Sequence, residues 1–288
     1  MGAPFFCRRN VLFALVAGVL ALATLGLCCI SLGPPSTAQA FAGRPQPSEH
    51  VYTDASGARV ATAETGPEDG PLVLFVHGTP GGWRAFSFVL ADARLARRAR
   101  LISVDRPGWG GSSASGVVSS LAEQAGALRT VLAAHTHGGP AVVVGHSLGG
   151  PIAARLALDA PELVRALVLV APSIDPELEQ PTWYQSLART WLVRPLVPTG
   201  LARADDEIRP LKRELEALLP RWSSLRMPVF VVQGEDDSLV PAANADFAAR
   251  VLTNARLTIE RIPDQGHFIP WERPQLITDA VLRALDER

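Results

Sequence analysis

Short apolar runs alternate along this chain with stretches of helical character, and this alternation restricts the possible folds. The apolar runs cover residues 72–76, 101–104, 141–144, 166–170, 229–232 and 257–262. The helical stretches cover 84–97, 120–134, 151–159, 242–251 and 274–285. Continuous apolar runs are typical of strands buried on both faces. Their alternation with helices predicts an α/β fold, a mainly parallel sheet with helices on both faces.

Two more strand-like pieces precede this pattern, at residues 51–53 and 59–65. The residues between them include Ala-Ser-Gly-Ala at 55–58, which suits a hairpin turn. We therefore expect an antiparallel hairpin at one edge, which brings the predicted sheet to eight strands.

Residues 172–222 interrupt the alternation because they contain no strand candidate. Two helical segments, 183–193 and 205–219, lie there among several prolines. We interpret this stretch as a small helical cap inserted into a core formed by residues 44–171 and 223–288. A chain of 288 residues with 48% apolar content can bury one such core.

Residues 1–43 are predicted to be an N-terminal signal or membrane anchor followed by a linker. Residues 11–32 carry no charge and follow Arg8 and Arg9, so they can insert into a bilayer with the N-terminus inside. The run is long for a signal peptide, which favours an uncleaved transmembrane anchor, although cleavage after Ala40 stays open. We expect the protein to be membrane-anchored with its globular part outside the cytoplasm, or secreted or periplasmic if cleaved.

Charge and cysteine content restrict partners and chemistry. The net charge of −1 offers no broad basic surface, so we expect no nucleic-acid partner. Cys7, Cys28 and Cys29 are the only cysteines, so the globular part has neither a thiolate nucleophile nor thiolate metal ligands. The six histidines show no closely spaced metal-binding pair. We expect no metal site, and the oligomeric state stays open.

The strongest local motif is Gly-His-Ser-Leu-Gly-Gly at 145–150, directly after one apolar run and directly before a helical stretch. This arrangement matches the nucleophile elbow, a sharp turn from strand to helix that exposes a serine at the sheet edge. The helix N-terminus behind Ser147 favours developing negative charge. The motif therefore indicates Ser147 as a candidate nucleophile.

Two further motifs stand at predicted strand ends: His-Gly-Thr-Pro-Gly-Gly at 77–82 and Asp-Arg-Pro-Gly-Trp-Gly-Gly-Ser at 105–112. With the serine motif they follow the order of the α/β-hydrolase family, which the sequence resembles over roughly residues 51–288. The resemblance implies the α/β-hydrolase fold and a catalytic triad in the order serine, acid, histidine.

The resemblance assigns the remaining site residues. His267, between the last predicted strand and the C-terminal helix, stands where the family places its base. Asp237 matches the acid in the loop after strand 229–232, although Asp175 follows the preceding strand and stays an alternative. The family's oxyanion hole maps onto the backbone N–H groups of Thr79 and Leu148.

The reaction implied is acyl transfer from a small-molecule ester or amide to water, which needs no cofactor. We favour a serine hydrolase of the carboxylesterase type, acting on a small to medium apolar acyl group. Aminopeptidase or amidase, carbon–carbon bond hydrolase and cofactor-free perhydrolase share the same triad and stay open, as does a non-catalytic binding module. Apolar cap residues such as Trp183, Trp191 and Leu215 either line an acyl pocket or form the cap's own core.

Overall fold

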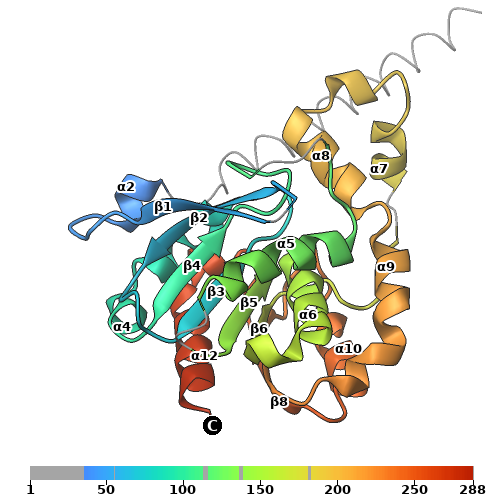
Figure 1. Cartoon of the computed structure of the whole chain (residues 1–288). Coiled ribbons are helices and arrows are strands. Elements are labelled where there is room, and N and C mark those ends of the chain that lie inside the picture. Colours follow the sequence, from blue (N-terminus) through green and yellow to red (C-terminus); the bar gives the residue numbers. More distant parts are fainter. Residues whose placement is uncertain (1–35, 55, 113–115, 136–138, 181–182, 288) are drawn as a thin grey trace, which may run out of the picture.

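The computed structural model of this chain describes residues 36–54, 56–112, 116–135, 139–180 and 183–287. One sheet of eight strands runs through it in the order β1-β2-β4-β3-β5-β6-β7-β8 (Figure 1). The strands are β1 (Ser48–Thr53), β2 (Arg59–Thr65), β3 (Leu72–Val76), β4 (Arg100–Val104), β5 (Ala141–His146), β6 (Val164–Val170), β7 (Pro228–Gly234) and β8 (Arg256–Ile262). The pairs β1–β2 and β2–β4 are antiparallel and all other neighbours are parallel, which confirms the predicted sheet.

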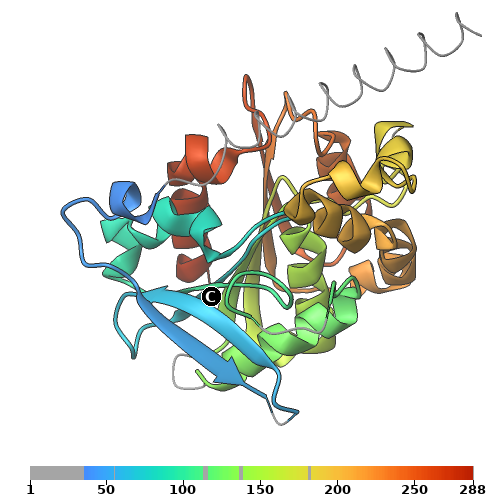
Figure 2. The ribbon, with the colours of Figure 1, turned by 90° about the horizontal axis from the view of Figure 1, so that it is seen from above.

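Helices cover both faces of the sheet, as Figure 2 shows from above. One face carries α5 (Leu121–Ala133), α6 (Gly149–Asp159), α9 (Leu211–Leu218) and α10 (Ala243–Val251). The other carries α2 (Thr37–Ala40), α3 (Ser87–Leu90), α4 (Ala93–Ala96), α11 (Ile269–Glu272) and α12 (Pro274–Asp286). Alternate side chains of one strand enter the two clusters: Leu72 and Leu74 face the first, and Val73 and Phe75 face the second.

The stretch 84–97, expected as one helix, is divided into three short elements. They are the 3-10 helix η1 (Trp83–Phe86), α3 and α4. Asp92 separates the last two, since its backbone is extended and its carboxylate accepts a hydrogen bond from the Arg94 N–H. This N-cap favours a new helix start over continuation of the preceding turn.

The insertion after β6 contains α7 (Trp183–Ala188), the 3-10 helix η4 (Arg194–Leu196), α8 (Thr199–Ile208), α9 and the 3-10 helix η5 (Leu219–Ser224). Another 3-10 helix, η3 (Pro161–Leu163), precedes β6. The segment 205–219 was expected to be one helix, but Pro210 separates α8 from α9 because proline lacks the N–H needed in a helix interior. Leu211, Leu215 and Leu218 of α9 pack into the main core cluster, so α9 belongs to the core as well as to the insertion.

The residues just before the first strand are also packed on the domain. Ser36 caps α2, and Ala40 and Phe41 are buried in the cluster of α3 and α12. Residues 36–41 thus pack on the domain although they lie on the N-terminal side of the predicted boundary at residue 43. The predicted transmembrane segment at 11–32 lies outside the described residues, and within the described ranges no helix is both long and apolar enough to cross a bilayer.

Candidate active site

Ser147 occupies the turn between β5, which ends at His146, and α6, which begins at Gly149. Its backbone has φ of 55°, a left-handed conformation that non-glycine residues seldom adopt. The Ser147 N–H donates to the Val170 carbonyl oxygen at 3.0 Å, which fixes this turn to the end of β6. Strained residues of this kind concentrate at functional sites, where the surrounding structure enforces them.

The loop after β3 passes directly over this serine. A Cβ atom on Gly78 would lie 2.7 Å from the Ser147 Cβ, closer than two such atoms can approach. Only glycine therefore lets the loop come this near to the serine. The close contact places the next residue, Thr79, beside the nucleophile position.

His267 and Asp237 meet above the ends of β7 and β8. The His267 Nδ1–H donates to the Asp237 Oδ2 at 2.7 Å, and both side chains are almost fully buried. The other carboxylate oxygen, Oδ1, accepts from the backbone N–H groups of Leu239 and Val240 at 2.9 and 2.8 Å. With its carboxylate held on both oxygens, Asp237 fixes the orientation and tautomer of the His267 ring.

Gly234 explains how these two loops come together. A Cβ atom at Gly234 would lie 2.2 Å from the Gln265 carbonyl oxygen, so a larger residue would force the loops apart. The Asp236 N–H also donates to the Gln265 carbonyl at 3.0 Å. The end of β7 and the loop after β8 are thus joined at their backbones just before Asp237 and His267.

Asp175, the alternative acid, has a different set of partners. Its Oδ2 accepts from the Arg250 guanidinium at 3.1 Å, and its Oδ1 accepts from the Glu177 N–H at 3.0 Å. The structure therefore brings Asp237, and not Asp175, to the histidine.

The two backbone donors expected to form an oxyanion hole are both available. Leu148 is the residue before the first turn of α6, and neither its N–H nor that of Thr79 has an acceptor among the described residues. The Leu148 N–H lies at a helix start, where unpaired donors attract negative charge. The Thr79 hydroxyl is also buried without a hydrogen-bond partner.

In the described part of the chain, the Ser147 hydroxyl makes no hydrogen bond to His267. Nucleophile–base contacts in sites without substrate are often long and tighten when substrate binds. The orientation of the ring is already set by its other nitrogen, so closing this contact does not require a change of tautomer.

His146 contacts both the backbone and the ring of His267. Its Nε2–H donates to the His267 carbonyl oxygen at 3.0 Å, and the two imidazole rings lie 4.7 Å apart between centroids. Burial, together with the nearby His267 ring, lowers the pKa of His146 to about 3. His146 is therefore a neutral ring that holds the backbone of the base.

Arg106 connects the loop after β3 to α5 and α8. The sequence did not indicate this role. Its guanidinium donates to the carbonyl oxygens of His77 and Gly78, both at 2.8 Å. The same group contacts Gln124 and forms an ion pair with Glu207 of α8, with both charged side chains at most 1% exposed. Burial and the nearby Arg106 guanidinium lower the pKa of His77. Its neutral ring therefore accepts a hydrogen bond at Nε2 from the backbone N–H of Arg106.

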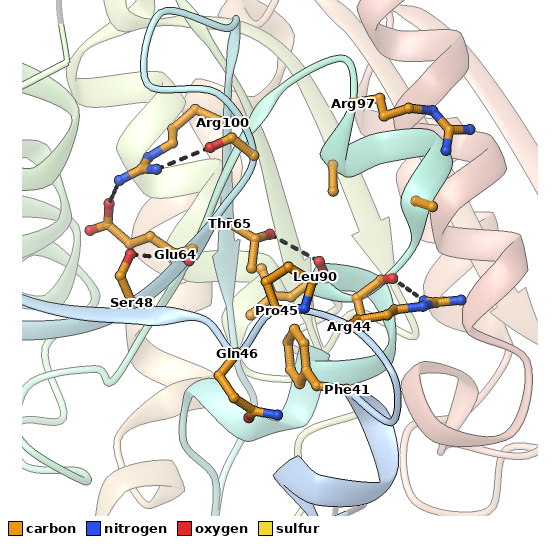
Figure 3. A pocket seen from close by; sticks show the side chains of 14 residues that line it. Phe41, Arg44, Pro45, Gln46, Ser48, Glu64, Thr65, Leu90, Arg97 and Arg100 are labelled. Carbon is orange, nitrogen blue, oxygen red and sulfur yellow. Dashed lines mark hydrogen bonds and ion pairs between the residues drawn. The ribbon is translucent and has the colours of Figure 1, made fainter.

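A cavity of about 430 Å³ lies elsewhere in the molecule, between residues 41–48, β2, β4, α3 and α4 (Figure 3). Its lining includes Phe41, Arg44, Thr65, Leu90 and Arg100. The guanidinium of Arg44, labelled in Figure 3, donates to the Ala91 carbonyl oxygen and so connects residue 44 to the end of α3. None of the lining residues belongs to the Ser147 site. The described residues also hold no group of three or more His, Cys, Asp and Glu side chains that could bind a metal ion.

A serine on a strained strand-to-helix turn, a histidine–carboxylate pair and an eight-stranded sheet of this order define the class of α/β hydrolases. The chain belongs to the Alpha/beta hydrolase family, whose model matches residues 73–280.

Individual relatives differ in what they do. The chain is 30% identical over 250 residues to a magnesium-chelatase 30 kDa subunit of Rhodobacter capsulatus, covering 72% of this chain and 84% of that one. It is 30% identical over 237 residues to a pimeloyl-[acyl-carrier protein] methyl ester esterase of Nitrosomonas europaea, covering 69% and 89%. A solved structure of E-2-(acetamidomethylene)succinate hydrolase superposes with a TM-score of 0.65 at 23% identity, covering 84% and 100%.

Proposed function

We propose that this protein is a serine hydrolase that cleaves carboxylic esters of small to medium apolar acyl groups. The observation that carries the proposal is the geometry around Ser147. A strained turn presents this serine, the backbone N–H groups of Leu148 and Thr79 have no acceptor, and the His267–Asp237 pair contacts the residue before the serine, His146. A hydroxyl needs such a base to become a nucleophile, and a developing oxyanion needs donors fixed in advance.

The reaction proceeds by two acyl transfers. The Ser147 oxygen attacks the ester carbonyl while His267 Nε2 accepts the hydroxyl proton, and the N–H groups of Leu148 and Thr79 bind the oxyanion. The tetrahedral adduct collapses, the alcohol leaves with the proton from His267, and the acyl group remains on Ser147. Water then attacks this ester in the same way, with His267 as base, and releases the acid. Asp237 stabilises the charged imidazole in both halves.

The preference for esters has support from the Nitrosomonas relative, whose name states a methyl ester substrate. The proposed chemistry needs no metal ion or organic cofactor. The His-Gly-Thr-Pro-Gly loop at 77–81 is close to that of proline iminopeptidases, so amide hydrolysis is the second candidate. An amide differs in its leaving group, which His267 must protonate before the carbon–nitrogen bond breaks.

The test is hydrolysis of p-nitrophenyl esters of rising acyl length by the full chain, alongside amides of the same acyl groups. Ser147→Ala and His267→Ala should each lower kcat by about 10⁴-fold or more. Ser223→Ala and His50→Ala replace exposed residues of the same types and serve as controls. Turnover that survives in Ser147→Ala would contradict the mechanism. Faster turnover of amides than of matched esters would replace the ester proposal with the amidase one.

A further inference from the structure

The insertion exposes an apolar ridge formed by Trp183, Leu187, Trp191, Leu192 and Leu196. These residues come from α7, η4 and the segment between them. Trp183 is 74% exposed and Trp191 is 82% exposed, whereas Trp83 and Trp222 of the core are at most 5% exposed. Several large apolar side chains exposed within one short stretch of chain are typical of a surface that meets an apolar partner.

Charged side chains of the same insertion form a cluster of ion pairs. Arg189 pairs with Asp205 at 2.8 Å, and Arg194 pairs with both Asp205 and Asp206. Arg209 pairs with the same two carboxylates, so three arginines share two aspartates and this cluster keeps one positive charge. Binding by the ridge should depend on apolar burial, to which tryptophan contributes most at the boundary between lipid and water.

The N-terminal side of the chain leaves little freedom between the domain and residues 11–32. Ser36 caps α2, Phe41 is 2% exposed in the core, and Arg84 donates to the Thr37 hydroxyl at 3.3 Å. Packed structure thus begins four residues after Leu32. A fully extended chain of that length reaches at most about 14 Å. If residues 11–32 insert into a bilayer, some face of the domain must lie against it.

Figure 1 shows α2 and the insertion helices α7 and α8 in the upper part of the molecule, on opposite flanks. We propose that the ridge is a membrane contact and that the domain rests on the lipid surface through α7 and η4. The proposal rests on insertion of residues 11–32. It adds a lipid-binding surface that the ester chemistry at Ser147 does not require.

The full chain tests this directly because its tryptophans report only on the domain: none lies among residues 1–35. The chain is reconstituted into vesicles of phosphatidylcholine with or without bromine on the acyl chains, and flotation separates the vesicle-bound fraction. Bromine quenches tryptophan only at contact range. We expect brominated lipid to lower the fluorescence by about a third, because two of the six tryptophans lie on the ridge.

The double variant Trp183→Phe/Trp191→Phe keeps the ridge apolar and should lose this quenching while still floating. The control Trp109→Phe/Trp271→Phe removes two partly buried tryptophans elsewhere and should remain quenched. Flotation without quenching, or equal quenching in the ridge variant, would show that the ridge faces another partner such as a second copy, and would overturn the proposal. Absence of flotation would refute the insertion as well. Ester turnover is measured separately on the same samples, so failure here leaves the proposed activity intact.

Discussion

Replacing Glu207 should destabilise this protein far more than replacing a carboxylate of the same kind on its surface. Arg106 and Glu207 form an ion pair with side chains 0% and 1% exposed. Glu207→Ala leaves the guanidinium with carbonyl and amide acceptors from His77, Gly78 and Gln124, but with no negative charge. An unpaired buried charge of this kind costs about 3–5 kcal/mol of unfolding free energy.

The matched control is Asp279→Ala. Asp279 pairs with Arg94 at 2.8 Å, but the side chains are 51% and 47% exposed. Water and salt screen such a pair, and its loss costs at most about 1 kcal/mol. Urea unfolding followed by tryptophan fluorescence measures both variants. A Glu207→Ala protein within about 1 kcal/mol of the wild type would refute the argument, because the guanidinium would then have another source of compensation.

The same ion pair should influence catalysis. Arg106 holds the two carbonyls that precede Thr79, and Thr79 supplies a proposed oxyanion donor. Glu207→Gln keeps the shape of the side chain but weakens its hold on Arg106. We expect kcat for ester hydrolysis to fall about tenfold with little change in KM, because a displaced donor weakens transition-state binding selectively. An unchanged kcat would mean that the pair stabilises the fold alone.

Three further predictions concern the acid, the ring behind the base and the N-terminal residues. Asp237→Asn should lower kcat by about 10⁴-fold while Asp175→Asn changes it little, since only Asp237 contacts His267; comparable losses in both would contradict this assignment. His146, with its pKa lowered from 6.5 to about 3, stays neutral in the folded protein while the unfolded chain takes up a proton below pH 6.5. Its contribution to stability is therefore full above pH 6.5 and lost as pH falls toward 3. Between pH 6.5 and 5 the loss is about 2 kcal/mol, and urea unfolding should show that His146→Gln removes it. Phe41→Ala should cost about 3–5 kcal/mol in the same assay, whereas Phe41 in a flexible linker would be neutral.

The sheet was predictable from the sequence because each strand carries its own signal. Runs such as 141–144 and 229–232 are continuously apolar, and they are buried in the structure on both faces. Helix boundaries were harder to predict where a capping residue or a proline ends a helix that the apolar periodicity would continue. The capping carboxylate of Asp92 divides one predicted helix and Pro210 divides another. Both residues were visible in the sequence, but their effect depends on how the chain turns around them.

Ser147 could be named from its glycine-flanked motif between a strand and a helix, whereas Asp237 and His267 were named through the resemblance to the α/β-hydrolase family, since Asp175 also follows a strand end. The packing of Phe41 could not be foreseen in this way. Phe41 sits between residues that read as linker, and it is buried by α3 and α12, elements far along the chain. Burial of a single aromatic residue leaves no periodic signal that distinguishes it from an exposed one.

The Arg106–Glu207 ion pair could not be predicted from the sequence, because only the folded structure brings the two residues together. Arg106 belongs to a loop with a motif, but Glu207 lies 101 positions later, on a helix with two other acidic residues. In sequence, Glu207 is no different from Asp205 or Asp206, which pair with arginines at the surface. What separates them is burial: the helix α8 turns Glu207 inward onto a guanidinium that already holds the loop beside Ser147. The insertion is therefore joined to the site through charge as well as through apolar packing, and any movement of α8 must either carry Arg106 with it or leave a buried charge unpaired.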